Sequence, residues 1–184
     1  MVKEMTKESL LSAFSGESMA HMRYLIFADV AEKEGFNNVA RLFRAIAYAE
    51  QVHATNHYRV LSVYNEDAKG CGGVPIGPGD TKKNLELAIR GEEFEVAEMY
   101  PTYMKIAEFQ GENDALRSFT YAYKAEQIHA RLYKEAKESV EAGKDLSING
   151  KVWICPICGY THVGENPPDR CPVCGAKGET FKSF

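Results

Sequence analysis

A six-residue segment that occurs twice constrains the fold more than any other feature of this sequence. Residues 49–54 read Ala-Glu-Gln-Val-His-Ala, and residues 125–130 read Ala-Glu-Gln-Ile-His-Ala. On a helix, positions i and i+3 lie on one face, so each Glu and His pair can reach a common centre. A Gly-Glu dipeptide is repeated in the same way at residues 16–17 and 91–92. These repeats predict two similar two-helix hairpins related by an approximate twofold axis.

Apolar residues recur every three or four positions through most of residues 6–142, which is the period of amphipathic helices. We expect four long helices that begin near Thr6, near Asn37 or Asn38, near Thr81 and near Asn113, with Gly35, Gly111 and Gly143 as stops. Thr6 and Asn113 are the expected N-caps of the first and last helices. Pro101 lies inside the third pattern, and we expect it to kink that helix without ending it. Four such helices predict a four-helix bundle.

Residues 66–80 are expected to form a loop that is longer than most connections between helices, because they contain five glycines and two prolines. This segment carries Cys71, which we interpret as an incidental thiol, with a redox or interchain role as the alternative. Glycine inside a helix costs about 1 kcal/mol relative to alanine. Its recurrence directly before Glu17 and Glu92 therefore predicts close helix packing at Gly16 and Gly91.

Glutamates interrupt the apolar stripe of each helix near its middle. They are Glu17, Glu50, Glu92, Glu95 and Glu126. An unpaired carboxylate is costly to bury, and no Lys or Arg lies at the centre of a stripe, so a bound cation is needed. Glu-x-x-His on two helices, with Glu on the other two, is the ligand set of di-iron and di-manganese bundles. Carboxylate oxygens with two imidazoles favour Fe or Mn over Zn.

The repeat is not symmetric at one position. Glu95 follows Glu92 by three residues, whereas the matching position on the first helix is Ala20. One metal ion therefore has an additional carboxylate within reach. A site that only holds two ions has no evident use for this group, whereas an ion that changes ligands during a redox cycle does.

The C-terminal segment has a different composition, because Gly, Pro and Cys crowd residues 150–178. Two Cys-x-x-Cys-Gly motifs supply four thiolates, which suit tetrahedral Fe or Zn, and a structural zinc ribbon is the alternative to an iron site. Trp153, Tyr160 and Phe181 are expected to pack around this site. We predict two domains, residues 1–146 and residues 147–184, and expect the second to need its metal for folding.

Composition excludes several classes of function. The chain of 184 residues has 26 Asp and Glu against 22 Lys and Arg, a net charge of −4, and no dense basic segment. This argues against nucleic acid or an anionic membrane as the main partner. No apolar run approaches the roughly 18 residues of a membrane span, and the N-terminus lacks the apolar stretch of a signal peptide. Paired Cys-x-x-Cys motifs then indicate metal binding in a reducing compartment.

Residues 16–24, 49–54, 91–101 and 125–130, together with the two cysteine motifs, resemble the rubrerythrin family over essentially the whole chain. The resemblance implies a mainly α fold, in which a ferritin-like di-iron bundle is followed by a small rubredoxin-like domain. It implies three iron ions per chain. The implied ligands of the iron pair are Glu17, Glu50, His53, Glu92, Glu95, Glu126 and His129. The implied ligands of the third iron are Cys155, Cys158, Cys171 and Cys174.

The family resemblance also implies residue roles. Glu50 and Glu126 would bridge the two ions. In the family, one iron exchanges the ligand that matches Glu95 for the one that matches His53 on reduction. The expected catalytic residues are therefore Glu50, His53, Glu95 and Glu126. Tyr24 and Tyr100 match tyrosines that lie beside the ligands.

The implied activity is that of a cytoplasmic peroxidase in oxidative-stress defence, which reduces hydrogen peroxide to water. The sequence has no Gly-x-Gly-x-x-Gly motif, so electrons are expected from a separate rubredoxin or NAD(P)H-dependent reductase. We expect a homodimer or higher homo-oligomer. Because the 66–80 loop is longer than the family pattern, pairing of the hairpins within one chain or across a dimer stays open. A ferritin-like ferroxidase or iron-storage protein, and a non-enzymatic metal-binding protein with structural zinc, are the alternatives.

Overall fold

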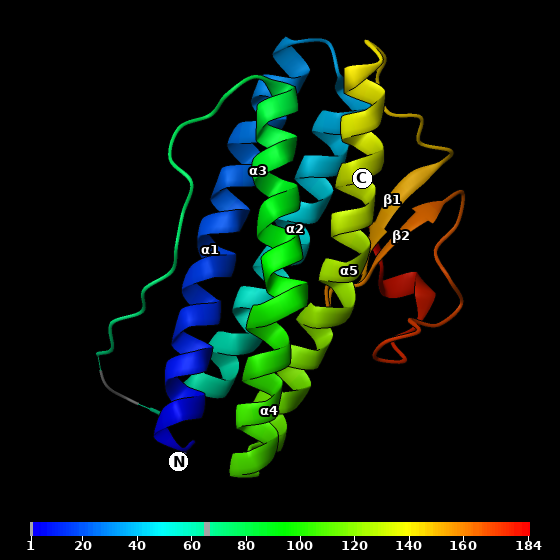
Figure 1. The fold of residues 1–184 in the computed structure, drawn as a ribbon. Coiled ribbons are helices and arrows are strands. Elements are labelled where there is room, and N and C mark those ends of the chain that lie inside the picture. The colour runs from blue at the N-terminus through cyan, green and yellow to red at the C-terminus, as the bar shows by residue number, and fades with distance from the viewer. Residues whose placement is uncertain (1, 65–66) are drawn as a thin grey trace.

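The computed structural model describes residues 2–64 and 67–184, so Met1, Asn65 and Glu66, the first residue of the predicted loop, lie outside the described residues. The fold is mainly α, as predicted. Long helices lie side by side, and a small C-terminal sheet packs against one side of them (Figure 1). Among the described residues, none of the helices has an apolar stretch long enough to span a bilayer.

The helices form two antiparallel hairpins within this one chain. Their bounds are Glu4–Lys33 (α1), Asn37–Leu61 (α2), Thr81–Phe94 (α3), Glu95–Met99 (η1, a π-helical segment), Tyr100–Gln110 (α4) and Asn113–Glu141 (α5). α1 packs on α2, while α3, η1 and α4 run on as one rod that packs on α5. The predicted glycine stops are confirmed, because Gly35, Gly111 and Gly143 all have the positive φ that favours glycine after a helix.

The predicted N-caps Thr6 and Asn113 are wrong. α1 begins two residues before Thr6, which is buried inside the helix, where its hydroxyl donates to Gln110 Oε1 at 2.6 Å. Asn113 is the first residue of α5 and Glu112 occupies the cap position. The Thr6 hydroxyl thus bonds to a residue at the end of α4, and no local pattern in the sequence reveals that partner.

The third helix continues through Pro101, as predicted. The proline has no N–H for the Ala97 carbonyl, and Ala97 lies in the π-helical segment Glu95–Met99. A single wide turn of this kind accommodates a missing hydrogen bond, and π-helical turns occur frequently at functional sites. The segment begins at Glu95, the residue that breaks the internal symmetry of the sequence.

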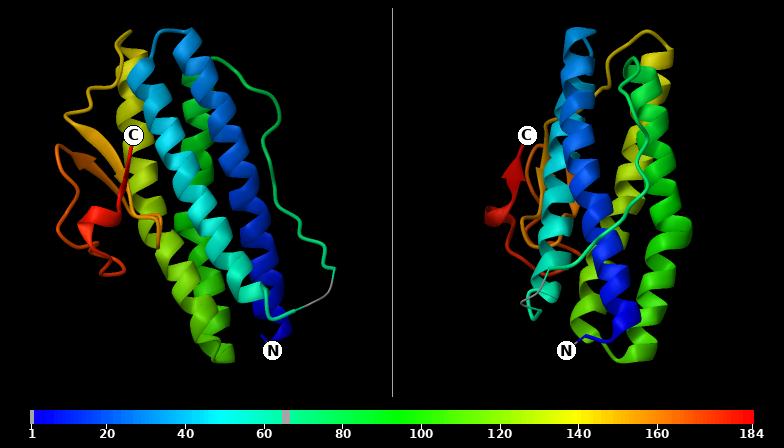
Figure 2. Two further views of the ribbon diagram at one scale, coloured as in Figure 1. Left: turned by 180° about the vertical axis from the view of Figure 1, so that it is seen from behind. Right: turned by 90° about the vertical axis from the view of Figure 1, so that its left-hand side faces the viewer.

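The long connection crosses the length of the bundle. Since α2 and α3 run in the same direction, the chain must return to the other end, and its described part, residues 67–80, runs along the outside of α1 (Figures 1 and 2). We call this segment the strap. It lies close to α1, because a Cβ on Gly70 would come 2.9 Å from the Leu11 carbonyl oxygen. A Cβ on Gly72 would come 3.3 Å from the Gly16 nitrogen.

The prediction of close helix packing at Gly16 and Gly91 is wrong. A Cβ on either residue would meet no atom within 4 Å outside its own helical turn. Both glycines instead line a cavity between α1, α3 and the strap. Their recurrence keeps space open and does not bring helix backbones together.

Within the bundle, the buried apolar residues form two clusters with a polar layer between them. One contains Tyr24, Phe43, Leu85 and Tyr133, and the other contains Leu10, Tyr100, Ala107 and Phe119. Along α1, α2, α5 and the continuous α3–η1–α4 helix, the buried glutamates and histidines lie between the residues of these two clusters. The apolar clusters therefore fix the four helices above and below the polar layer.

The C-terminal region is a three-stranded antiparallel sheet with the order β2-β1-β3. Its strands are Lys151–Ile154 (β1), Thr161–Gly164 (β2) and Lys182–Ser183 (β3), and a short 3₁₀ turn, Gly178–Thr180 (η2), precedes β3. Val152 and Ile154 are buried in the same apolar cluster as residues of α2. The sheet lies against α2 and α5, on the side of the bundle away from the strap (Figure 2). The domain boundary at 146/147 falls in the connection between α5 and β1 and stays a prediction.

Candidate metal centre

Six of the seven predicted ligands of the metal pair meet in two overlapping groups. One group consists of Glu17, Glu50, His53 and Glu126, and the other consists of Glu50, Glu92, Glu126 and His129. Within each group, one possible ligand atom per residue lies within 4.8 Å of all the others. All six side chains are at most 1% exposed. α1, α2, α3 and α5 each contribute, as the sequence pattern requires.

Two carboxylates face both groups. Glu50 places Oε2 2.9 Å from His53 Nδ1 and Oε1 3.4 Å from His129 Nδ1. Glu126 places Oε1 2.8 Å from His53 Nδ1 and Oε2 2.6 Å from His129 Nδ1. Each therefore offers one oxygen to each half of the site, which is the arrangement that a bridging role requires. Glu17 lies on the His53 side and Glu92 on the His129 side.

Orphaned polar atoms provide a test of whether these residues fit a metal pair. Among the described residues, the buried side-chain atoms without a hydrogen-bond partner include one carboxylate oxygen from each of Glu17, Glu50, Glu92 and Glu126. Buried acceptors left unsatisfied are expensive, and more so when they are charged. Two cations among these oxygens would satisfy all four. The donor set of carboxylates and two imidazoles fits iron or manganese.

The electrostatics of the site show how strongly the carboxylates need positive charge. Burial and then the charge of Glu95 raise the pKa of Glu17 well above its ordinary value, and burial and then Glu126 do the same for Glu92. Burial alone would lower the pKa of His129, but the carboxylates of Glu126 and Glu50 outweigh it and raise the pKa to about 9. Without metal, protons and imidazolium groups must supply the charge that cations would otherwise supply.

Glu95 is the predicted ligand that lies outside both groups. It is half-buried at the start of η1 and lines the cavity under the strap. Loss of hydration, and then the charges of Glu126 and Glu50, raise the pKa of its carboxyl well above the ordinary value. The charges of the site therefore act on the Glu95 carboxyl, although this carboxyl belongs to neither group of possible metal ligands.

Both predicted flanking tyrosines lie against the carboxylates. Tyr24 Oη donates to Glu92 Oε1 at 2.6 Å, and Tyr100 Oη donates to Glu17 Oε1. Because each hydroxyl donates to a terminal carboxylate, it holds that carboxylate in position and leaves its second oxygen free for a cation.

His57 has a role that the sequence analysis did not identify. Its Nε2 lies 3.1 Å from Tyr100 Oη, and its Nδ1 lies 2.8 Å from Ser118 Oγ. Burial, and then the charge of His53, lower its pKa to about 3, so the ring is neutral. Its position one turn after His53, on the same face, was the signal that this ring faces the site. The matching contact of Ser118 had no sequence signal.

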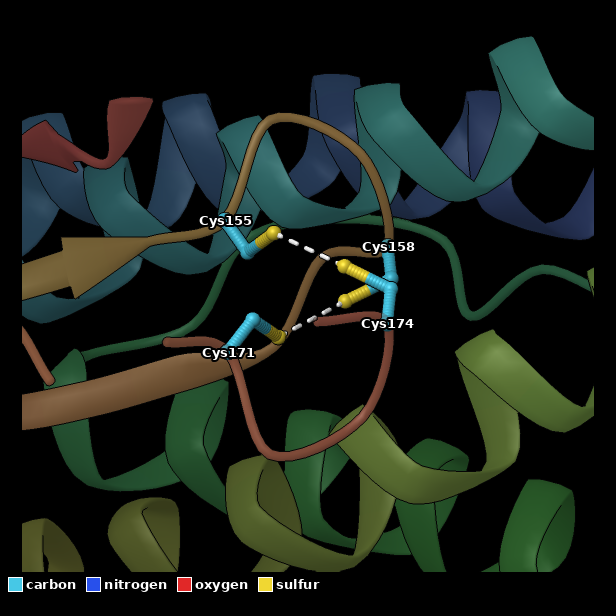
Figure 3. A group of neighbouring side chains, drawn as sticks. All are labelled: Cys155, Cys158, Cys171 and Cys174. Carbon is cyan, nitrogen blue, oxygen red and sulfur yellow. Dashed lines mark hydrogen bonds between the residues drawn. The ribbon is translucent and has the colours of Figure 1, made fainter. Parts of the chain in front are cut away.

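The four predicted cysteines form the second candidate centre. Their sulfur atoms all lie within 4.8 Å of one another and turn inward between two loops (Figure 3). In each loop, a glycine with positive φ, Gly159 or Gly175, closes the turn by donating its N–H to the first cysteine of the motif. Trp153, Tyr160 and Phe181 pack around the cluster as predicted, and Tyr121 from α5 joins them.

The two candidate centres are in direct contact through the loop that follows Cys158. A Cβ on Gly159 would lie 2.0 Å from His53 Nε2, so the backbone at this residue touches the imidazole. Two residues later, Thr161 Oγ1 lies 2.8 Å from His129 Nε2 and donates to the Gly159 carbonyl at 3.3 Å. The hydroxyl thus accepts from His129 Nε2–H, so Nδ1 is the ring nitrogen that faces the carboxylates and that a bound metal ion would use. The sequence did not predict these contacts, because they join separate regions.

Comparison with known proteins agrees with this arrangement. The family model described as rubrerythrin matches residues 8–137, and the model described as the rubredoxin-like domain of rubrerythrin matches residues 153–182. Rubrerythrin-2 of Clostridium acetobutylicum is 47% identical over 98% of this chain and 97% of the relative. Nigerythrin of Nitratidesulfovibrio vulgaris is 34% identical over 97% of this chain and 86% of the relative.

Solved structures extend the likeness to the fold. A structure described as the fully reduced, all-ferrous state of nigerythrin matches with a TM-score of 0.86 at 33% identity, covering 97% of this chain and 86% of the other. A ferritin from M. penetrans matches with a TM-score of 0.63 at 15% identity, covering 76% of this chain and 87% of the other. The ferritin likeness concerns the fold alone.

Proposed function

Because this chain belongs to the rubrerythrin family, we propose that it is a non-haem di-iron peroxidase that reduces hydrogen peroxide to water. Electrons would arrive from an external donor protein and pass through the iron held by the four cysteines. The observation that carries the proposal is the contact of the cysteine loop with both histidines of the carboxylate site. A ferritin-like ferroxidase would share the bundle but would have no use for this contact.

We propose three iron ions per chain. The pair would be held by Glu17, Glu50, His53, Glu92, Glu95, Glu126 and His129, and the third by Cys155, Cys158, Cys171 and Cys174. When bound, the ferrous pair supplies two electrons, one from each ion, which is the number that one peroxide molecule consumes. The all-ferrous description of the related nigerythrin structure supports iron as the metal.

On the electron side, the chain's own residues bring the two centres together. Gly159, directly after the ligand Cys158, contacts His53, and Thr161 holds the His129 ring through its Nε2–H. Only the backbone of one glycine lies between the cysteine and the imidazole. Electron transfer across so few atoms needs no large movement of either region.

On the proton side, a chain of hydrogen bonds leads from the surface to Glu17. Ser118 lines an open surface cavity of about 760 Å³. Since Tyr100 donates to Glu17, its oxygen accepts from His57 Nε2–H, and His57 Nδ1 then accepts from the Ser118 hydroxyl. Every donor thus points toward Glu17. Peroxide reduction consumes two protons, and a neutral imidazole that donates at one nitrogen and accepts at the other can relay them.

The proposal has three further parts. The donor would be a rubredoxin or an NAD(P)H-dependent reductase, since the chain has no Gly-x-Gly-x-x-Gly motif of its own. The protein would work in the cytoplasm, where cysteine thiolates stay reduced. It would assemble as a homodimer or a higher homo-oligomer.

The direct test uses iron-reconstituted protein that is reduced without oxygen and then mixed with hydrogen peroxide. We expect three irons per chain, reoxidation of the pair by one equivalent of peroxide, and reoxidation of the cysteine-bound iron by further peroxide through the pair. Absorbance in the visible range follows both centres. If peroxide leaves the reduced iron-loaded protein unchanged, the protein is not a peroxidase.

A further inference from the structure

The proposed reduction of hydrogen peroxide does not explain the size or the lining of a cavity under the strap. The cavity has a volume of about 600 Å³ and lies between α1, α3 and η1, with Cys71 and Pro75 in its roof. Glu95, the predicted ligand outside the two four-residue groups, lines it. The strap and the C-terminal sheet lie on opposite sides of the bundle (Figure 2), so this approach to the site is separate from the electron side.

Two glycines leave the space open. Gly16 and Gly91 both line the cavity, and a Cβ on either would meet no atom within 4 Å. Each directly precedes a predicted ligand, Glu17 or Glu92. A larger side chain at either position would occupy the cavity beside the site.

The cavity is much larger than hydrogen peroxide requires. A water molecule occupies about 30 Å³ in the liquid, and hydrogen peroxide is only slightly larger. Sites for organic ligands are typically about 300–1,000 Å³, and the observed volume of about 600 Å³ falls inside that range.

The lining combines an apolar wall with two cations. Leu87, Phe94 and Met99 supply apolar surface, whereas Arg23 and Arg90 supply guanidinium groups. Arg23 contacts the ring of Tyr24, and its charge acts on the Glu95 carboxyl. In the described part of the chain, no carboxylate forms an ion pair with either arginine. Guanidinium groups recognise carboxylates by charge-assisted hydrogen bonds. An amphipathic anion therefore fits this lining.

We propose that this cavity binds organic hydroperoxides that carry a carboxylate, such as fatty-acid hydroperoxides, as a second substrate class of the proposed peroxidase. The acid group would lie at the arginines, the carbon chain along the apolar wall, and the hydroperoxide toward Glu95. The O–O bond breaks, one oxygen leaves as water and the other remains as an alcohol. Two protons and two electrons are consumed, and the electrons come from the same reduced metal pair and donor protein.

The first test compares linoleic acid hydroperoxide with its methyl ester and with hydrogen peroxide, using reduced, iron-loaded protein. One charge-assisted contact is worth about a tenfold preference, so the acid should react about ten times faster than the ester. Arg23→Gln combined with Arg90→Gln should bring the ratio of acid to ester close to one. Arg44→Gln is the matched control, because Arg44 pairs with Asp29 and Glu32 outside the cavity.

The second test measures binding without turnover. When the four ligand cysteines hold metal, Cys71 is the remaining thiol of the five in the chain, and it lies in the cavity roof. The hydroxy fatty acid, which cannot be reduced further, should slow the reaction of Cys71 with a maleimide several-fold, and the methyl ester should protect less. Gly91→Leu, which extends a side chain into the cavity, should abolish the protection while the variant keeps its helical circular dichroism.

The outcomes separate this inference from the function on which it rests. If hydrogen peroxide fails to reoxidise the protein, the proposed peroxidase is wrong. If hydrogen peroxide reacts but the acid and the ester react at equal rates, the substrate class is wrong and the peroxidase stands. If the hydroxy acid gives Cys71 no protection, the cavity is not a carboxylate site, whatever the rates.

Discussion

Single side chains explain how a bundle can bury so many acids. Tyr24 and Tyr100 each donate a hydrogen bond to one terminal carboxylate, while Glu50 and Glu126 each divide their two oxygens between the halves of the site. One oxygen on each of four glutamates is left without a hydrogen-bond partner. Those oxygens identify where cations would bind, and Glu95 is not among them.

Replacement of Glu95 by alanine should separate metal binding from turnover. The two four-residue groups do not include Glu95, so we expect Glu95→Ala to bind the metal pair normally. Loss of a carboxyl that exchanges ligands or protons should slow peroxide turnover at least about a hundredfold. Glu98→Ala, an exposed neighbour on the same π-helical segment, is the control. Metal analysis and stopped-flow rates check both parts, and an unchanged rate in Glu95→Ala would remove this residue from the mechanism.

Replacement of Ser118 by alanine should interrupt the proton route at its outer end. His57 Nδ1 then loses the hydroxyl that donates to it. We expect peroxide turnover to fall roughly tenfold, with a larger solvent deuterium isotope effect, because a relay of protons contributes to the barrier. Ser139→Ala is the matched control on α5, since the Ser139 hydroxyl donates to the Glu135 carbonyl of its own helix. Equal rates and isotope effects in both variants would contradict the route.

Among the structural elements, turns and irregular segments bring several functional residues to the site. The regular helices support these segments. The π-helical segment begins at Glu95, the strap covers the cavity, and the loop after Cys158 reaches the histidines. The two Cys-x-x-Cys-Gly turns have nearly the same backbone at their glycines, with φ of +78° at Gly159 and +77° at Gly175. Only the turn at Gly159 contacts a histidine of the carboxylate site, so substitutions at the two glycines can be compared directly.

Gly159→Ala and Gly175→Ala should have different effects on electron transfer. Both introduce a side chain at positive φ, which costs about 1–2 kcal/mol in either turn. The Gly159 variant also places a methyl group 2.0 Å from His53 Nε2, whereas a Cβ on Gly175 meets nothing within 4 Å. We expect Gly159→Ala to move the cysteine loop away from His53 and to slow oxidation of the cysteine-bound iron by peroxide. The Gly175 variant should retain the rate, and equal slowing in both would show that backbone strain alone is responsible.

For the molecule as a whole, the buried charges link stability to metal and pH. Burial and neighbouring charges raise the pKa values of Glu17, Glu92 and Glu95, and carboxylates raise that of His129 to about 9. Groups with a raised pKa stabilise the fold at low pH and lose that contribution as pH rises through the folded value. Glu50 and Glu126 have lowered pKa values, so their contribution is lost on acidification below the ordinary carboxyl range.

The metal-free protein should therefore lose stability as the solution becomes alkaline. We expect its melting temperature to fall between about pH 6 and about pH 10, as His129, whose pKa is raised to about 9, gives up its proton. The metal-loaded protein should change much less over the same range, because cations hold the ligand groups deprotonated throughout. Melting curves by circular dichroism check this, and parallel curves with and without metal would contradict it.

Local patterns were sufficient for the helices and for the composition of the site. The period of the apolar residues predicted the helices and their glycine stops, and Glu-x-x-His predicted which side chains share a face, because both depend only on helix geometry. Four buried glutamates at matching positions demanded a cation wherever the helices met. The spacing of the four cysteines was sufficient to predict that they form a metal site. Even Thr6, however, was misread as a cap, since its partner Gln110 lies on another helix.

Only the tertiary structure decided how the parts face one another. It set the crossover of the strap, the open space beside Gly16 and Gly91, the place of Glu95 at a cavity, and the chain of bonds through His57 and Ser118. It also brought Gly159 and Thr161 onto the two histidines. These features arise between segments far apart in the chain, where contact depends on the packing of whole elements. A residue's type and spacing predict what it can bind, whereas its neighbours across the bundle determine what it does bind.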